Sequence, residues 1–299
     1  MKSTSREYLS PEIISRLSRL DLIAKHVVEG YITGLHKSPY HGFSTEFAEH
    51  RQYMRGDSLR FLDWKVYGRT DRMYVKRFEE ETNLKSHIIL DVSGSMGFKS
   101  KGAVTKLEYA NILAASLAFL MIRQRDSVGM LTFSDELRSH IPPRSVQSQL
   151  TEIIKVLSST EPSGTTITGS ILHTLAERLT ARGLVILISD LIVDPDELIH
   201  GLKHFRHNGH EVLVFHIVDP MELEFDYTEE TRFIDSETGE KITTQPWHIR
   251  DKYLSMFNEH LSTIIHSMHD ISVDYARLET NVPLDRALTE YLAKRKRLR

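Results

Sequence analysis

Residues 87–95 of this 299-residue chain read His-Ile-Ile-Leu-Asp-Val-Ser-Gly-Ser, and this segment is the central feature of the sequence. The apolar run from His87 to Leu90 ends in a Ser/Gly turn, which is typical of a short buried strand. Asp91 then lies at the carboxyl end of that strand, and the turn carries Ser93 and Ser95. Because ligands bind beyond the carboxyl ends of strands in open parallel sheets, the same stretch also predicts where a site lies.

Strand-like and helix-like segments alternate downstream of this stretch. Three more short apolar runs predict strands, at 127–133, 184–188 and 212–218. Apolar residues at helical spacing predict helices, at 106–124, 146–157, 167–179, 195–207, 247–269 and 283–296, and a late strand is expected at 271–275. The alternation predicts an α/β fold, with a doubly wound, mostly parallel, Rossmann-like sheet and helices on both faces.

The segment before residue 83 has a different pattern. Ser10-Pro11-Glu12 is a helix start signal, and apolar residues at helical spacing extend the predicted helix from 11 to 35. Alternating residues at 73–78 predict a strand or hairpin. We expect 1–82 to form an N-terminal helix and a signature segment packed on the main domain. The main domain then spans 83–299, with a hairpin insertion near 219–246 and C-terminal helices.

Composition narrows the class of protein. The net charge of -3 gives no reason to expect a nucleic-acid partner, and the absence of cysteine excludes disulfides and cysteine chemistry. The chain has no apolar run of the roughly 18 residues that cross a bilayer. Residues 1–10 also lack the apolar stretch of a signal peptide. We therefore expect a cytoplasmic protein without a membrane span.

Oxygen-bearing side chains follow the predicted strands at successive sheet edges. Asp91, Ser93 and Ser95 follow the first strand, and Asp190 follows the strand at 184–188. Thr165 lies in a Gly-Thr loop just before a predicted helix. Carboxylates and hydroxyls are ligands for hard cations, so the sequence predicts a site for Mg²⁺, or for Mn²⁺ or Ca²⁺. These five protein groups would leave one coordination position open for an acidic side chain of a partner.

This pattern resembles the metal-ion-dependent adhesion site of von Willebrand factor A domains. The flanks resemble a bacterial family called domain of unknown function 58, over about residues 10–295. The matching residues are Gly42-Phe-Ser-Thr-Glu46-Phe47, Arg51, Tyr53, Gly56-Asp57, Arg60, Asp63-Trp64, Arg69, Asp219-Pro220, Glu237-Thr-Gly-Glu240, Tyr253 and Pro283-Leu284.

The resemblance carries its own implications. It implies a von Willebrand factor A-like domain whose serines and threonine bind the metal and whose aspartates act through water. It implies as partner a MoxR-type AAA+ ATPase or its client, in chaperone-like assembly or maturation of protein complexes. Thr166 competes with Thr165 for the threonine role, because Ser163 replaces a glycine of the family pattern.

We expect a binding module without catalytic or cofactor-binding residues. The chain has no phosphate-binding Gly-x-x-x-x-Gly-Lys-Ser/Thr loop and no Gly-x-Ser-x-Gly elbow around Ser95. Two rival interpretations use the same residues: a metal-dependent hydrolase or phosphatase, and a metal-free structural scaffold. His200 and His204 could also chelate a transition metal, although a solvated helix face is the simpler interpretation. The Arg-rich segment from Arg51 to Arg72 is interpreted as an ion-pair network.

Overall fold

The computed structural model describes residues 20–36, 50–52, 64–76, 85–100, 104–165, 168–179, 181–236 and 239–297. The chain divides into two compact units, residues 1–34 together with 84–299, and residues 35–83. Several features predicted from the sequence lie outside the described residues: the helix start at 10–12, the signature residues at 42–47, 53, 56–57, 60 and 63, Thr166, and the turn residues 237–238.

The smaller unit contains a short antiparallel pair of strands. β1 (His50–Gln52) pairs with β2 (Tyr74–Lys76), and Arg51 lies opposite Val75. α3 (Trp64–Thr70) precedes β2. The strand predicted near 73–78 is thus confirmed at 74–76. Residues 53–63 are not described, so the ion-pair network expected between Arg51 and Arg72 stays a prediction.

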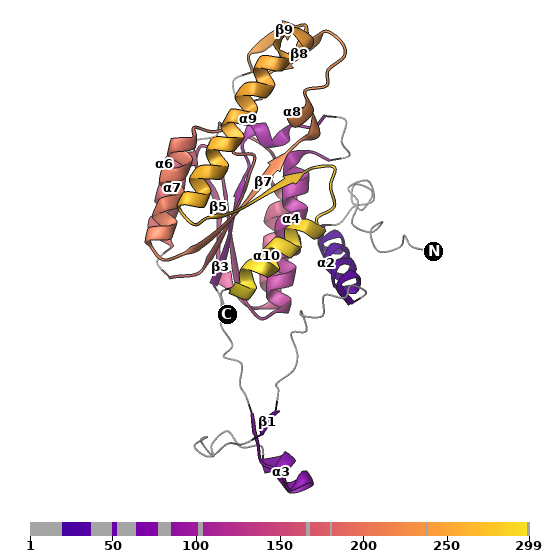
Figure 1. The fold of residues 1–299 in the computed structure, drawn as a ribbon, viewed down its shortest axis with the longest axis vertical. Helices are drawn as coiled ribbons and strands as arrows, with labels where there is room; N and C mark the ends of the chain where they lie inside the picture. The colour runs from indigo at the N-terminus through magenta and orange to yellow at the C-terminus, as the bar shows by residue number, and fades with distance from the viewer. Residues whose placement is uncertain are drawn as a thin grey trace, which may run out of the picture. The chain divides into compact units, whose positions relative to one another are not determined.

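A six-stranded sheet forms the centre of the larger unit (Figure 1). Its order is β10-β7-β6-β3-β4-β5, and every pair is parallel except β4 with β5. The strands are β3 (Lys85–Asp91), β4 (Ser127–Phe133), β5 (Leu137–Arg144), β6 (Leu184–Ser189), β7 (Glu211–Val218) and β10 (Asp274–Glu279). The sheet confirms the predicted α/β class with a mostly parallel sheet.

The sequence did not indicate β5, the antiparallel edge strand. Pro142 and Pro143 lie inside it, and proline is tolerated in a sheet chiefly at an edge or a bulge. The β4–β5 register shifts between Val128 and Met130. The side-chain amide of Gln149 donates to the carbonyl oxygens of Val128 and Pro142, at 2.8 Å each. This side chain satisfies backbone groups at the irregular part of the ladder.

Helices cover both faces of the sheet (Figure 1). One side carries α6 (Thr168–Arg178), α7 (Pro195–His207) and α9 (Pro246–Asp270). The other side carries α4 (Lys106–Arg123), α10 (Asp285–Arg297) and α2 (Leu20–His36), and α5 (Gln147–Ser159) packs on α4. Tyr31 of α2 is 3.2 Å from Thr289 of α10, hydroxyl to hydroxyl. No helix among the described residues is both long and apolar enough to cross a membrane.

Alternate residues of each strand enter different layers of the core. Ile89, Val185, Leu187 and Val214 pack in one cluster with residues of α6, α7 and α9. Their neighbours Ile88 and Leu90 are also fully buried, so both faces of the sheet are covered. This explains why the parallel strands appear in the sequence as continuous apolar runs.

The chain reverses its direction of winding at β3. β4 pairs with one side of β3, and β6 returns to pair with the other side. Asp91 and Ser189, the last residues of β3 and β6, therefore lie at a topological switch point, where open α/β sheets bind ligands.

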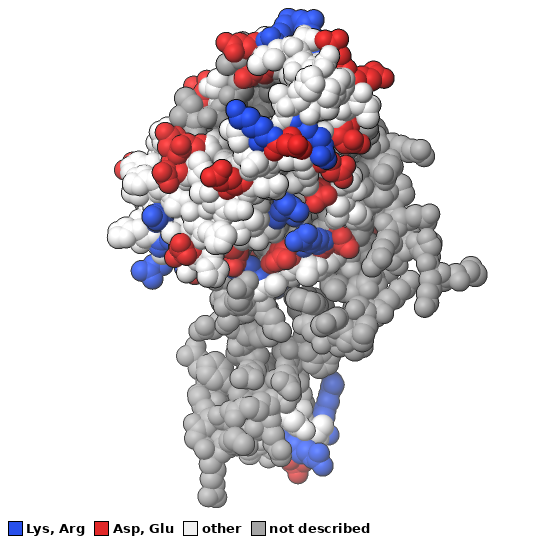
Figure 2. Space-filling view, turned by 45° about the horizontal axis from the view of Figure 1, so that its top comes forward, with Lys and Arg blue, Asp and Glu red and all other residues white. Residues whose placement is uncertain are grey.

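A hairpin arm lies between β7 and α9. It comprises α8 (Pro220–Glu224), β8 (Thr231–Ile234) and β9 (Lys241–Thr244). β8 and β9 pair antiparallel, which confirms the predicted hairpin. Acidic and basic side chains are interspersed on the face of the larger unit shown in Figure 2.

Candidate metal site

The turn after β3 carries the first part of the site. The buried Asp91 carboxylate accepts a hydrogen bond from the Ser93 backbone N–H at 2.9 Å. Ser93 occupies the cap position of the short 3-10 helix η3 (Gly94–Gly97), but its side chain makes no capping bond. Its hydroxyl lies 3.0 Å from the Ser95 hydroxyl instead. The simplest structural role of Ser93, capping a helix, is therefore not the one that its side chain performs.

Asp190 lies across the switch point, directly after β6. The hydroxyl of Ser189 donates to Asp91 Oδ2 at 2.6 Å and accepts from the Leu191 backbone N–H at 3.0 Å. Leu191 has a φ of 53°, so the chain turns sharply after Asp190. Ser189 thus connects the ends of the two strands and keeps both aspartates at the same edge of the sheet.

The loop with Thr165 is attached to the turn after β3 by backbone bonds. The Ser163 N–H donates to the Val92 carbonyl at 2.9 Å, and the Gly94 N–H donates to the Gly164 carbonyl at 3.0 Å. Gly164 has a φ of +81°, and a Cβ there would lie 2.6 Å from Asp135 Oδ1, so glycine is required. Thr165 follows on this loop and is exposed.

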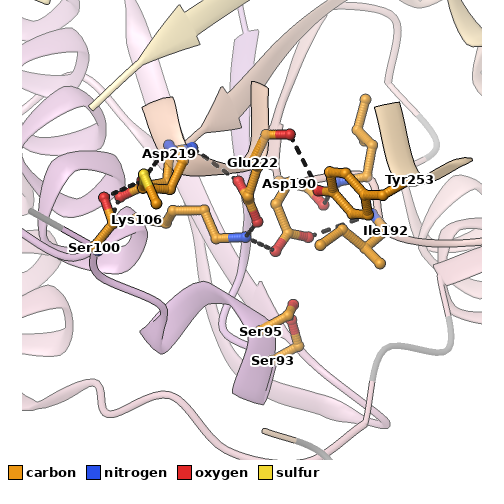
Figure 3. Close-up of polar contacts among 12 residues, drawn as sticks. Ser93, Ser95, Ser100, Lys106, Asp190, Ile192, Asp219, Glu222 and Tyr253 are labelled. Carbon is orange, nitrogen blue, oxygen red and sulfur yellow. Dashed lines mark hydrogen bonds and ion pairs between the residues drawn. The ribbon is translucent and has the colours of Figure 1, made fainter. Parts of the chain in front are cut away.

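Lys106 is part of the site, although no sequence pattern indicated it. It is the first residue of α4, and its side chain is 0% exposed. Its ammonium donates to Asp190 Oδ2 and to Glu222 Oε1, at 2.7 Å each (Figure 3). Glu222 lies on α8, where its other oxygen accepts from the Asp219 N–H at 2.8 Å. Only tertiary structure brings these residues together, because Lys106 and Glu222 are 116 residues apart in the sequence.

The two aspartates have opposite electrostatic environments. Burial and the negative charge of Asp190 raise the pKa of Asp91 from 3.8 to about 7. Burial alone would also raise the pKa of Asp190, but the Lys106 ammonium beside it lowers that pKa below its usual value. Burial raises the pKa of Glu222, and Lys106 opposes that rise. Asp91 is therefore the carboxylate whose charge is least compensated.

A hard cation at this site would need hydroxyl oxygens as ligands in addition to carboxylates. Among the residues with assigned positions, no three His, Asp or Glu side chains are placed to hold a metal ion. A metal here would need hydroxyl ligands as well as the two aspartates. Ser93 and Ser95 supply such hydroxyls next to Asp91, and uncharged oxygens with carboxylates are what Mg²⁺ and Ca²⁺ prefer. The buried and poorly compensated Asp91 carboxylate is consistent with this chemistry.

The tip of the hairpin arm lies against the turn after β3. A Cβ placed on Gly94 would be 2.7 Å from the backbone oxygen of Ser236, which follows β8. The arm is attached to α9 by an aromatic cluster. Its ring centroids lie 4.3–5.8 Å apart, and its members are Phe225, Tyr227, Phe233, Tyr253 and Phe257. The hairpin thus borders the side of the site that Gly94 forms.

The histidines of α7 have a neighbour on α6. The His204 ring lies 4.1 Å from that of His173 and 6.1 Å from that of His200, between centroids. Close packing of the two helices accounts for this, because a Cβ on Gly201 would lie 2.7 Å from Leu172 Cβ. The rings pack on one another as side chains of neighbouring helices.

Comparison with known proteins gives one family. The family model described as "Protein of unknown function DUF58" matches residues 49–263. An uncharacterized protein of Mycobacterium tuberculosis, Rv1480, is 22% identical over 292 residues, which are 96% of this chain and 91% of that protein.

Two solved structures are similar to part of this chain. An aerotolerance-related membrane protein from Bacteroides fragilis aligns with a TM-score of 0.49 and 20% identity, over 71% of this chain and 99% of the other. The SpRpn10 VWA domain aligns with a TM-score of 0.40 and 13% identity, over 69% of this chain and 93% of the other.

Proposed function

Since this chain belongs to the family described as protein of unknown function DUF58, we propose that it is a non-enzymatic, divalent-metal-dependent protein-binding module. The proposed ligands are Asp91, Ser93, Ser95, Thr165 and Asp190. The observation that carries the proposal is the meeting of two buried carboxylates and two hydroxyls at the switch point between β3 and β6. A divalent cation would supply the positive charge that Asp91 lacks.

Binding of a partner follows from the number of ligands. Mg²⁺ prefers six oxygen ligands in octahedral geometry and usually retains water. Five protein groups, some of them acting through water, leave at least one position for an outside ligand. A carboxylate of a partner protein suits that position, because the bound cation would attract it and would accept an oxygen ligand.

The identity of the partner rests on family resemblance. We propose a MoxR-type AAA+ ATPase or its client as the acidic partner, in chaperone-like assembly or maturation of protein complexes. A cytoplasmic location likewise stays a prediction from sequence.

A pull-down with the purified MoxR-type ATPase of the same genome tests the proposal. The wild-type chain should retain the ATPase in Mg²⁺ and lose it in excess chelator. Asp91→Asn should lose it under both conditions, while Asp196→Asn, at an exposed aspartate of α7, should behave like the wild type. Retention by Asp91→Asn in the presence of chelator would show that any binding is independent of the metal site.

A metal-free scaffold is the second candidate, and Lys106 is the observation that favours it. Its ammonium lies 2.7 Å from Asp190 and already compensates one of the two acids. A protein that uses this internal cation in place of a metal would bind its partner equally well in Mg²⁺ and in chelator.

A further inference from the structure

Lys106 is an unusual neighbour for a cation site. Its side chain is fully buried, and its ammonium contacts two carboxylates, those of Asp190 and Glu222. The Phe98 ring lies 5.7 Å from the same nitrogen, measured to the ring centroid. A buried ammonium is costly unless it is paired, so these contacts fix it in place. The site thus contains a fixed positive charge next to an aspartate that the proposed metal also needs.

The charges of the cluster do not balance without a further cation. Asp91, Asp190 and Glu222 supply three carboxylates, and Lys106 supplies one ammonium. With all of them ionised, the cluster carries two negative charges, and one divalent ion would neutralise it. Lys106 and a divalent ion would therefore be present together, and both would interact with Asp190.

Glu222 allows Lys106 to remain charged when Asp190 turns toward a metal. Its Oε1 holds the ammonium, and its Oε2 is fixed by the Asp219 N–H. Its backbone carbonyl accepts from the Tyr253 hydroxyl of α9 at 3.1 Å (Figure 3). Glu222 is therefore held in position independently of Asp190, and Lys106 keeps one carboxylate partner if it releases the other.

We propose that Lys106 is an internal counter-ion that occupies Asp190 in the metal-free protein and competes with the divalent ion for that carboxylate. This inference rests on the proposed metal site. It makes Lys106 a positioning residue that sets how weakly the site binds metal. Removing the ammonium should make metal binding tighter, which is a gain that damage to the structure cannot produce.

The test is a calorimetric titration of Mg²⁺ into the full chain and two variants. Lys106→Met removes the ammonium. The double variant Lys106→Met/Glu222→Gln removes one positive and one negative charge, so the net charge of the cluster is unchanged. We expect Mg²⁺ to bind both variants about tenfold or more tightly than the wild type, because Asp190 would no longer have to release the ammonium before it binds the ion. Circular dichroism verifies that each variant is folded.

The double variant distinguishes competition of Lys106 with Mg²⁺ for Asp190 from an effect of net charge alone on the affinity for Mg²⁺. If it binds Mg²⁺ no more tightly than the wild type, Lys106 does not compete for Asp190, and the proposal is overturned even if Lys106→Met binds more tightly. It also keeps the test decisive if Lys106→Met alone does not fold, because its cluster has the same net charge as that of the wild type.

Failure of the inference can be told apart from failure of the proposed function. If the wild type binds Mg²⁺ and neither variant binds more tightly, the metal site stands and the role of Lys106 is wrong. If only the variants bind, Lys106 is confirmed as a counter-ion, and the native protein uses it instead of a metal. If none of the three binds Mg²⁺, both ideas are wrong.

Discussion

Replacing Asp91 by asparagine should stabilise the metal-free protein, and the gain should grow as the pH rises. Burial and Asp190 raise the pKa of Asp91 from 3.8 to about 7 in the folded state. An acid with a raised folded pKa favours the fold at low pH, and that contribution is lost as the pH rises through the folded pKa. The wild-type chain therefore loses stability from about pH 4 to about pH 7 because of Asp91, and Asp91→Asn should not.

The magnitude follows from the size of the pKa shift. At about 1.4 kcal/mol per pKa unit, an ionised Asp91 costs on the order of 4 kcal/mol above about pH 7 and between 1 and 2 kcal/mol near pH 5. Asparagine keeps the shape of the side chain, so it can still accept from the Ser93 N–H and can contact the Ser189 hydroxyl. Any other effect of the new amide on the free energy of unfolding is the same at pH 5 and at pH 8, because the amide does not titrate. The stability difference between variant and wild type should therefore widen by about 2–3 kcal/mol from pH 5 to pH 8.

Urea unfolding in excess chelator at the two pH values measures this difference. Asp196→Asn, at an exposed aspartate, should shift stability by about 0.5 kcal/mol or less at both. The difference in unfolding free energy between Asp91→Asn and the wild type should widen from pH 5 to pH 8. If it stays constant or narrows, the electrostatic argument for Asp91 is refuted.

Three other variants test separate parts of the structure. Gly94→Ala should displace the hairpin and speed amide hydrogen exchange in β8 and β9, because its Cβ would lie 2.7 Å from the Ser236 oxygen, whereas Gly68→Ala, with open space around it, should not. Burial lowers the pKa of His216 to about 3, so the contribution of this histidine to stability should fall as the pH drops below about 6.5, and urea titrations should show His216→Gln gaining stability relative to the wild type over that range. Thr165→Val should weaken Mg²⁺ binding by about tenfold without changing the melting temperature; a loss with Thr166→Val instead would assign the ligand role to Thr166.

The parallel strands could be predicted from the sequence because burial on both faces leaves a clear mark. The runs at 127–133 and 184–188 match β4 and β6 almost residue for residue. β10 was predicted at 271–275 but spans 274–279, since α9 continues to Asp270 and the chain turns at Ser272, with a φ of 56°. Ile271 packs beside the core from the end of the helix, so its apolar character does not mark a strand.

The candidate site was only partly predictable. Asp91 and Asp190 could be placed because each directly follows an apolar strand, and strand ends of a parallel sheet meet at one edge. Lys106 could not, because a lysine after a helix cap is an ordinary surface pattern, and its burial depends on Glu222 in a distant segment. The close approach of the Ser236 backbone to Gly94 could not be predicted either, because the two residues lie in distant segments of the chain. Sequence patterns show local order, whereas charge pairing across the fold needs the three-dimensional structure.

Calorimetric titration of Mg²⁺ into the wild-type chain and into Asp91→Asn shows whether the protein binds a metal ion through Asp91. We predict saturable binding of one ion per chain to the wild type and no binding to the variant, with both proteins folded. Equal binding to the two proteins would mean that the ion binds elsewhere, and an absence of binding to the wild type would contradict the metal site.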